Sequence, residues 1–125
     1  MKVWDLRNEA QPLNVIRFHD HLLGRLCDLY DCDAIYDKFE LAWNKNGSQL
    51  MTGSYSNTFY VCDAFGETRQ MLRAKNGQPA RGAGFGKGDN LNANQKVQHV
   101  AYHPRAELLA LGAKDFGYLY HKHPF

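Results

Sequence analysis

Long hydrophobic runs are missing from this sequence of 125 residues. No segment approaches the roughly 18 consecutive apolar residues that identify a membrane-spanning helix. The first ten residues carry Lys2, Asp5, Arg7 and Glu9 where a secretory signal would need an apolar stretch. These absences lead us to expect a cytoplasmic protein, with the nucleus as a second possible compartment.

Cysteine is scarce, and a strong net charge is absent. The three cysteines, Cys27, Cys32 and Cys62, have an odd number and an irregular spacing, so a disulfide framework is not expected and a reducing compartment is favoured. The formal net charge is only +2, with acidic and basic residues mixed along the chain. Because nucleic-acid and membrane-surface binders show a basic stripe, we expect neither as a partner.

What the sequence does contain is an internal repeat. Three pairs of segments agree on an offset of 58 or 59 in the numbering (61 − 3, 100 − 41 and 112 − 53): residues 3–5 with 61–63, residues 41–44 with 100–103, and Gly53 with Gly112. In the first pair Val-Trp-Asp matches Val-Cys-Asp, and in the second Leu-Ala-Trp-Asn matches Val-Ala-Tyr-His. Self-similarity at a fixed period indicates stacked copies of one small β unit.

Apolar alternation and turn residues predict the strands of each copy. Asn46-Gly47 and Ser56-Asn57 are typical of tight hairpin turns, whereas residues 19–29 fit a short helix as well as a loop. The expected strands are residues 2–6, 13–18, 39–43, 50–55, 58–62, 69–74, 97–102, 108–112 and 118–121. The aromatic residues expected in the core are Trp4, Trp43, Tyr102 and Tyr118.

Four antiparallel strands per copy, with Trp-Asp in one of them, are typical of a β-propeller blade. We therefore expect an all-β fold, a WD-repeat β-propeller segment of about two four-stranded antiparallel blades that leave the ring incomplete. Residues 1–18 are expected to hold the last strand of a preceding blade and the outer strand of the next, residues 19–74 a blade with an acidic top-face loop, residues 75–94 a flexible Gly-rich loop, and residues 95–125 the final blade strands. Residues 2–6 have the pattern of the last strand of a blade, and no earlier strands precede them in the sequence. We therefore expect a truncated polypeptide.

The middle of the chain resembles the C-terminal part of the B-type regulatory subunits of protein phosphatase 2A. The resemblance rests on Leu-Cys-Asp-Leu-Tyr at 26–30, Ile-Tyr-Asp-Lys-Phe-Glu at 35–40, Trp-Asn at 43–44 and Met-Thr-Gly-Ser-Tyr at 51–55, and extends from Lys2 to about Tyr120. It implies a seven-bladed propeller without catalytic activity, which binds substrates on its top face. It also implies partners: a catalytic subunit and a helical scaffold subunit, whose binding needs the blades that are missing here.

The resemblance further implies that top-face loop residues Tyr30, Asp31, Tyr36 and Lys38 contact substrates. Five acidic residues against the single base Lys38 give residues 28–40 a local charge of −4. A loop of this sign, edged by tyrosines, would attract basic or amphipathic segments of protein substrates. The expected substrate-binding residues are Tyr30, Asp31, Asp33, Tyr36, Asp37 and Lys38. The alternative is a solvated acidic turn without a binding role, whose aromatic residues only pack against the blade.

Motifs for catalysis or metal binding are not found. The histidine pairs lack the four converging ligands of a structural zinc site, and the Gly-rich run at 82–88 lacks the spacing and the Ser or Thr of a phosphate-binding loop. Ser54 does not lie in a nucleophile elbow. We expect no enzyme, no cofactor and no metal. Two alternatives to a phosphatase regulator remain: an interaction scaffold unrelated to phosphatases, and a propeller fragment without function.

Overall fold

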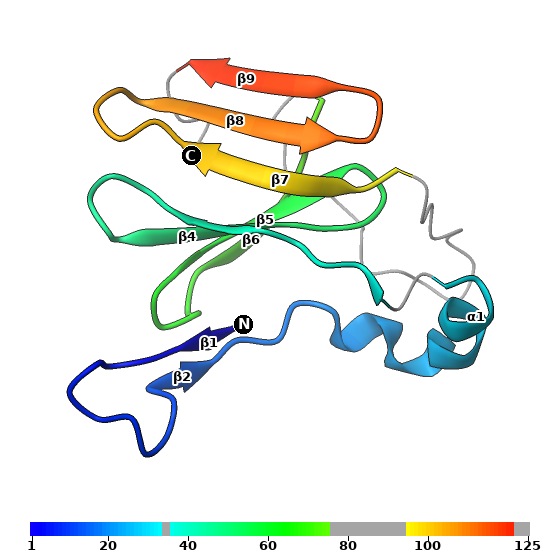
Figure 1. Cartoon of the computed structure of the whole chain (residues 1–125), viewed down its shortest axis with the longest axis horizontal. Coiled ribbons are helices and arrows are strands. Elements are labelled where there is room, and N and C mark those ends of the chain that lie inside the picture. The colour runs from blue at the N-terminus through cyan, green and yellow to red at the C-terminus, as the bar shows by residue number, and fades with distance from the viewer. Residues whose placement is uncertain (34–35, 76–94, 122–125) are drawn as a thin grey trace.

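The computed structural model describes residues 1–33, 36–75 and 95–121, which form three layers of antiparallel sheet with a short helical segment at one side (Figure 1). The strands are β1 (Lys2–Val3), β2 (Asn14–Val15), β3 (Leu41–Trp43), β4 (Gln49–Gly53), β5 (Thr58–Asp63), β6 (Arg69–Arg73), β7 (Val97–Tyr102), β8 (Leu108–Ala113) and β9 (Gly117–His121). The helical segment consists of the 3₁₀ helix η1 (Asp20–Arg25) and the α-helix α1 (Leu26–Asp31). In the described part of the chain, no helix has the length and apolar character needed to cross a bilayer.

Each layer is a meander in which strands that follow one another in the chain pair side by side. The orders are β1-β2, β3-β4-β5-β6 and β7-β8-β9, and every pairing is antiparallel. The expected all-β segment of propeller blades is confirmed, with four strands in the second layer and three among the described residues of the third. The division into domains stays a prediction, and residues 76–94 of its Gly-rich loop lie outside the described residues.

The turns follow the chemistry that the sequence predicts. Ser56 and Asn57 both have left-handed backbones, with φ of 54° and 55°, as the tight hairpin between β4 and β5 requires. Gly47 has a φ of 66° in the turn between β3 and β4. The side-chain oxygen of Asn44 accepts backbone hydrogen bonds from Ser48 at 2.9 Å and Gln49 at 3.1 Å, and these bonds close that turn.

The two larger sheets are copies of one unit, because their registers coincide. Ala42 lies opposite Met51 in the second layer, and Ala101 lies opposite Ala110 in the third, so both positions shift by an offset of 59 (101 − 42 and 110 − 51). In the next hairpin the corresponding pairs are Leu50 with Cys62 and Leu109 with Tyr120. Cys62 and Tyr120 differ by 58 in number (120 − 62), because the turn between β8 and β9 is one residue shorter than the turn between β4 and β5.

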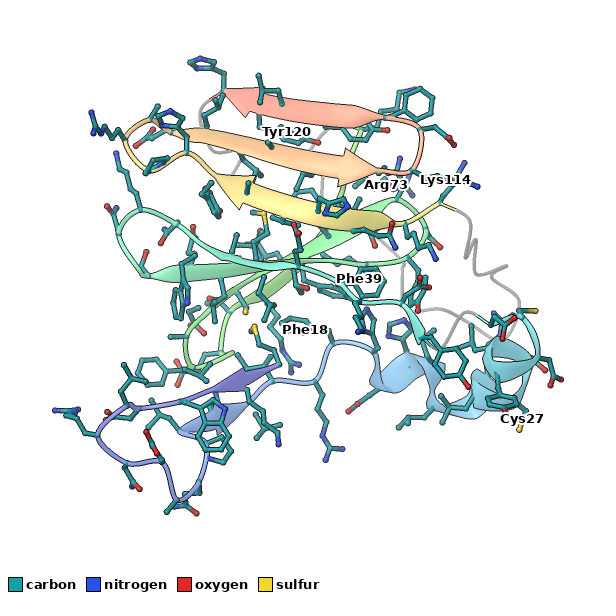
Figure 2. The ribbon with its side chains drawn as sticks, in the orientation of Figure 1. Phe18, Cys27, Phe39, Arg73, Lys114 and Tyr120 are labelled. Atoms are coloured by element: carbon teal, nitrogen blue, oxygen red, sulfur yellow. The ribbon has the colours of Figure 1, made fainter. Side chains whose placement is uncertain are left out.

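The main core lies between the second and third layers. It consists of buried Met51, Phe59, Val61, Leu72, Ala74, Val97, Val100, Leu109 and Leu111. The two layers approach closely at Gly53, where an added Cβ would lie 1.8 Å from the carbonyl oxygen of Val97. A smaller cluster of Ile16, Leu50 and Cys62 joins the first layer to the second, with Phe18 packed against it (Figure 2).

Two aromatic residues lie elsewhere than the sequence predicts. Trp4 and Trp43 are 47% and 46% exposed, so the prediction that they belong to the core is wrong for this chain. The two-stranded first layer packs on Leu50 of β4 and Cys62 of β5, whereas Leu41 and Trp43 of β3 stay about half exposed. Tyr102 and Tyr118 do pack against the main core, as expected.

Candidate functional site

The helical segment carries the first candidate binding residues, and packing holds it in place. A helix of six residues is too short to be stable by itself. Leu22 and Leu29 bury their side chains against Tyr55, and Phe39 packs on the same cluster (Figure 2). The opposite side of α1 faces solvent, so residues on that side are free to meet another molecule.

His19 fixes the start of the segment to the end of β4. Its Nε2 lies 3.0 Å from the Ser54 hydroxyl, and its ring lies 5.5 Å from the Phe39 ring and 5.7 Å from the Tyr55 ring, measured between centroids. Burial, and secondly the charge of the neighbouring His21, lower the pKa of His19 to about 4. The imidazole is therefore neutral near pH 7 and contributes no charge to the surface.

The chain reverses direction just after α1. The backbone N–H groups of Cys32 and Asp33 donate to the carbonyl oxygens of Asp28 and Tyr30, at 3.2 and 3.1 Å. Asp33 has a left-handed φ of 54°, a conformation that Asp tolerates better than most side chains. The reversal brings the rings of Tyr30 and Tyr36 within 6.3 Å, centroid to centroid.

Five of the six predicted site residues are exposed, and all five lie in α1 or in the segment between α1 and β3. Tyr30 and Tyr36 are 60% and 63% exposed, and the remaining members are also exposed. We call this set the acidic-aromatic surface, and its members are Tyr30, Asp31, Asp33, Tyr36 and Lys38. Aromatic surface next to carboxylates suits a basic protein segment that also carries apolar side chains.

Asp37, the sixth predicted residue, is placed differently. Its side chain is only 10% exposed and forms an ion pair with Lys96, which precedes β7. The pKa of the Tyr55 hydroxyl is raised by burial and, secondly, by the charge of Asp37. Asp37 therefore acts between the layers of the fold, and its role in substrate binding stays a prediction.

Sequence reasoning missed the partners of this region. Lys96 follows Asp37 at an offset of 59 (96 − 37), and His99 follows Glu40 at the same offset (99 − 40), with 3.1 Å between His99 Nδ1 and the carboxylate. The Glu40 carboxylate accepts hydrogen bonds from the His99 side chain and from the Val100 backbone N–H. These two bonds, the His99 bond most strongly, hold the pKa of Glu40 below its usual range. Equivalent positions of adjacent repeats thus lie side by side, and the repeat spacing is the signal that could have found both pairs.

The arrangement provides groups for binding. Within residues 1–33, 36–75 and 95–121, no group of three His, Cys, Asp or Glu side chains gathers to hold a metal ion. Cys27 is exposed on α1, away from the sheets (Figure 2). The exposed groups of the acidic-aromatic surface can offer negative charge and ring faces to a partner.

Stacked antiparallel meanders with matching registers define the class of this molecule, a segment of a WD-repeat propeller. No family model matches the chain. The chain is 36% identical over 135 residues to the gamma isoform of the 55 kDa B-type regulatory subunit of serine/threonine-protein phosphatase 2A from Rattus norvegicus, covering 96% of the chain and 30% of that protein. It is 33% identical over 140 residues to the phosphatase 2A regulatory subunit phr2AB of Dictyostelium discoideum, covering 96% of the chain and 29% of that protein. For the phosphatase PP2A 55 kDa regulatory subunit of Drosophila melanogaster the identity is 35% over 130 residues, covering 92% and 26%.

The chain belongs to the B-type regulatory subunit family of protein phosphatase 2A. It spans less than a third of the length of these relatives. The resemblance noted in the sequence is confirmed over almost the whole chain. The names of the relatives describe regulatory subunits, in agreement with the expectation of a protein that is not an enzyme.

Proposed function

We propose that this chain acts in a protein phosphatase 2A complex by recruiting substrates to the catalytic subunit. The observation that carries the proposal is the exposed pair of Tyr30 and Tyr36, with ring centroids 6.3 Å apart among exposed carboxylates. The names of the relatives support the regulatory part of this function. The chemistry of the surface supports the recruiting part, with basic or amphipathic protein segments as ligands.

Each residue of the surface has its own task in this proposal. Tyr30 and Tyr36 anchor apolar side chains of the substrate, because tyrosine buries a large area at a small entropy cost. Asp31 and Asp33 attract its basic residues, and Lys38 disfavours segments with the wrong charge pattern. Holding a substrate near a catalytic centre raises its effective concentration, to the millimolar scale for short flexible connections.

A direct binding measurement tests the anchoring role. A fluorescein-labelled amphipathic peptide of Lys, Arg and Leu is titrated with the chain, and anisotropy gives the dissociation constant. We expect the double variant Tyr30→Ala/Tyr36→Ala to bind about tenfold or more weakly, since a hot-spot anchor contributes more than about 1 kcal/mol. Phe65→Ala is the matched control, because Phe65 is 66% exposed and lies outside the surface.

Two results would count against the proposal. Equal affinity for the parent chain, the double variant and the control would show that the peptide binds elsewhere. In a full-length subunit that carries this segment, Lys38→Glu is expected to reduce co-precipitation of substrates and to leave scaffold binding intact. If substrate and scaffold co-precipitation both stay unchanged, the surface has been assigned wrongly.

A further inference from the structure

The segment at residues 37–39, which follows Tyr36, belongs to no helix or strand. Exposure alternates along it, as in extended backbone: Tyr36 and Lys38 are exposed, whereas Asp37 and Phe39 are partly buried. Phe39 packs on the buried cluster that holds the helical segment in place, so apolar contact fixes one inward side chain. Asp37 cannot be fixed in this way, because a carboxylate that leaves water needs a polar partner.

The polar partner of Asp37 comes from the third layer and is itself held on both sides. Lys96 Nζ donates to the Asp37 carboxylate, and the two side chains are 22% and 10% exposed. The residue after Lys96 donates its backbone N–H to the Ser54 carbonyl oxygen at 2.9 Å, and the residue before it accepts from the Asn57 N–H at 2.8 Å. The ammonium group of Lys96 therefore reaches Asp37 from a defined position.

A second contact fixes the end of the segment to the third layer as well. The Glu40 N–H donates to the Gln98 carbonyl oxygen at 3.0 Å, and the Glu40 carboxylate accepts from the Val100 N–H at 3.2 Å. The segment thus meets the third layer at both ends. Only the contact at Asp37 adjoins two members of the acidic-aromatic surface.

We propose that Lys96 is a positioning residue for ligand binding by the acidic-aromatic surface, an inference that rests on the proposed function of that surface. Lys96 acts through Asp37: the ion pair holds the carboxylate inward, and this directs the neighbouring side chains of Tyr36 and Lys38 outward. The pair is largely buried, so either partner alone would carry an uncompensated charge. Lys96 belongs to the next repeat, so the surface carried by one blade is fixed by another.

A direct role for Asp37 predicts the opposite effect of Lys96. If the Asp37 carboxylate contacted a basic ligand, Lys96 would compete with that ligand, and removing the ammonium group would strengthen binding. Removing a positive charge near the surface would also favour a basic ligand by simple electrostatic complementarity. Positioning predicts weaker binding, so the sign of the change separates the two roles.

The variant Lys96→Met keeps a long side chain, removes its charge and so tests the sign. With the labelled peptide of Lys, Arg and Leu, we expect it to bind about threefold or more weakly than the parent chain. Lys96→Arg should bind like the parent, since a guanidinium also pairs with a carboxylate. Lys45→Met is the matched control and should leave affinity unchanged. Lys45 pairs with Glu107 at 3.9 Å between the same two layers, at the turns that follow β3 and β7.

Nuclear Overhauser contacts between the Tyr30 and Tyr36 rings give a second readout that needs no ligand. The ring centroids lie 6.3 Å apart in the parent chain, and we expect these contacts to be lost in Lys96→Met and retained in Lys45→Met. Amide spectra establish that the variants are folded. If Lys96→Met does not fold, Asp37→Asn serves the same measurement, because the Lys96 side chain that remains is 22% exposed and can reach water.

Both readouts can overturn the proposal. Unchanged or tighter peptide binding by folded Lys96→Met would contradict it, and so would ring contacts that persist in that variant or in Asp37→Asn. A parent chain that binds no peptide would contradict the proposed function of the surface instead. The ring contacts would then still show whether Lys96 positions the two tyrosines.

Discussion

At the scale of single residues, charged side chains join the repeats at equivalent positions. Asp37 pairs with Lys96, and Glu40 pairs with His99, both at the offset of the repeat. The Glu40–His99 pair is exposed, and pairs of this kind contribute about 0–1 kcal/mol. The Asp37–Lys96 pair is largely buried, so losing either partner would leave a charge with little access to water. Because Asp37 is buried in this pair, its carboxylate is not available to a binding partner.

The stability of the fold should decrease in mild acid because of His19. Burial lowers its pKa from 6.5 to about 4 in the folded chain, and burial also lowers the pKa of His21. As the pH falls below 6.5, the unfolded chain therefore takes up these protons first. For His19 the stability is complete above pH 6.5, decreases down to about pH 4 and changes no further below it, a loss of about 2–3 kcal/mol.

The measurement is urea unfolding between pH 7 and pH 4, on the parent chain and on His19→Phe. The variant keeps an aromatic ring against Phe39 and Tyr55 but cannot take up a proton. We expect its free energy of unfolding to fall less steeply with decreasing pH. The same slope in both proteins would mean that other groups cause the acid sensitivity.

At the scale of elements, the close approach of β4 to β7 sets the geometry between layers. Val97 N–H donates to the Ser54 carbonyl oxygen at 2.9 Å, and a Cβ on Gly53 would meet the Val97 carbonyl oxygen at 1.8 Å. The two backbones cannot separate without breaking that hydrogen bond. The equivalent Gly112 is less confined, since its added Cβ would meet only the side chain of His99, whose Cβ lies 3.0 Å away.

Alanine at the two equivalent glycines should therefore have unequal effects. We expect Gly53→Ala to lower the free energy of unfolding by more than ordinary overpacking does, which costs about 1–3 kcal/mol. Gly112→Ala should cost clearly less, because a side chain can shift where a backbone cannot. Chemical unfolding of both variants gives the comparison, and equal losses would show that the layers are not held together at Gly53.

The strands were largely predictable, and the differences have physical causes. The expected strand at residues 97–102 agrees with β7 at both ends, because a buried apolar face and clear turns bound it. The expected strands at 2–6 and 13–18 shrink to Lys2–Val3 and Asn14–Val15. These two strands pair only with each other among the described residues, so few hydrogen bonds define their ends.

The candidate site was predictable only in part. The resemblance to the phosphatase subunits identified Tyr30 and Tyr36, and the structure brings their rings together. Sequence alone could not show that Asp37 turns inward, because this depends on Lys96 in the neighbouring repeat. The core position expected for Trp43 was also wrong, since the first layer packs on Leu50 and Cys62 and Trp43 stays about half exposed.

At the scale of the whole molecule, every conclusion depends on two sheets being copies of one blade. The repeat places the acidic-aromatic surface beside the second layer and aligns the ion pairs. Cross-strand nuclear Overhauser contacts in the isotopically labelled chain test this directly. We predict contacts that place Ala42 opposite Met51 and Ala101 opposite Ala110. Contacts showing different registers in the two sheets, or none between residues 97–102 and 108–113, would contradict the account.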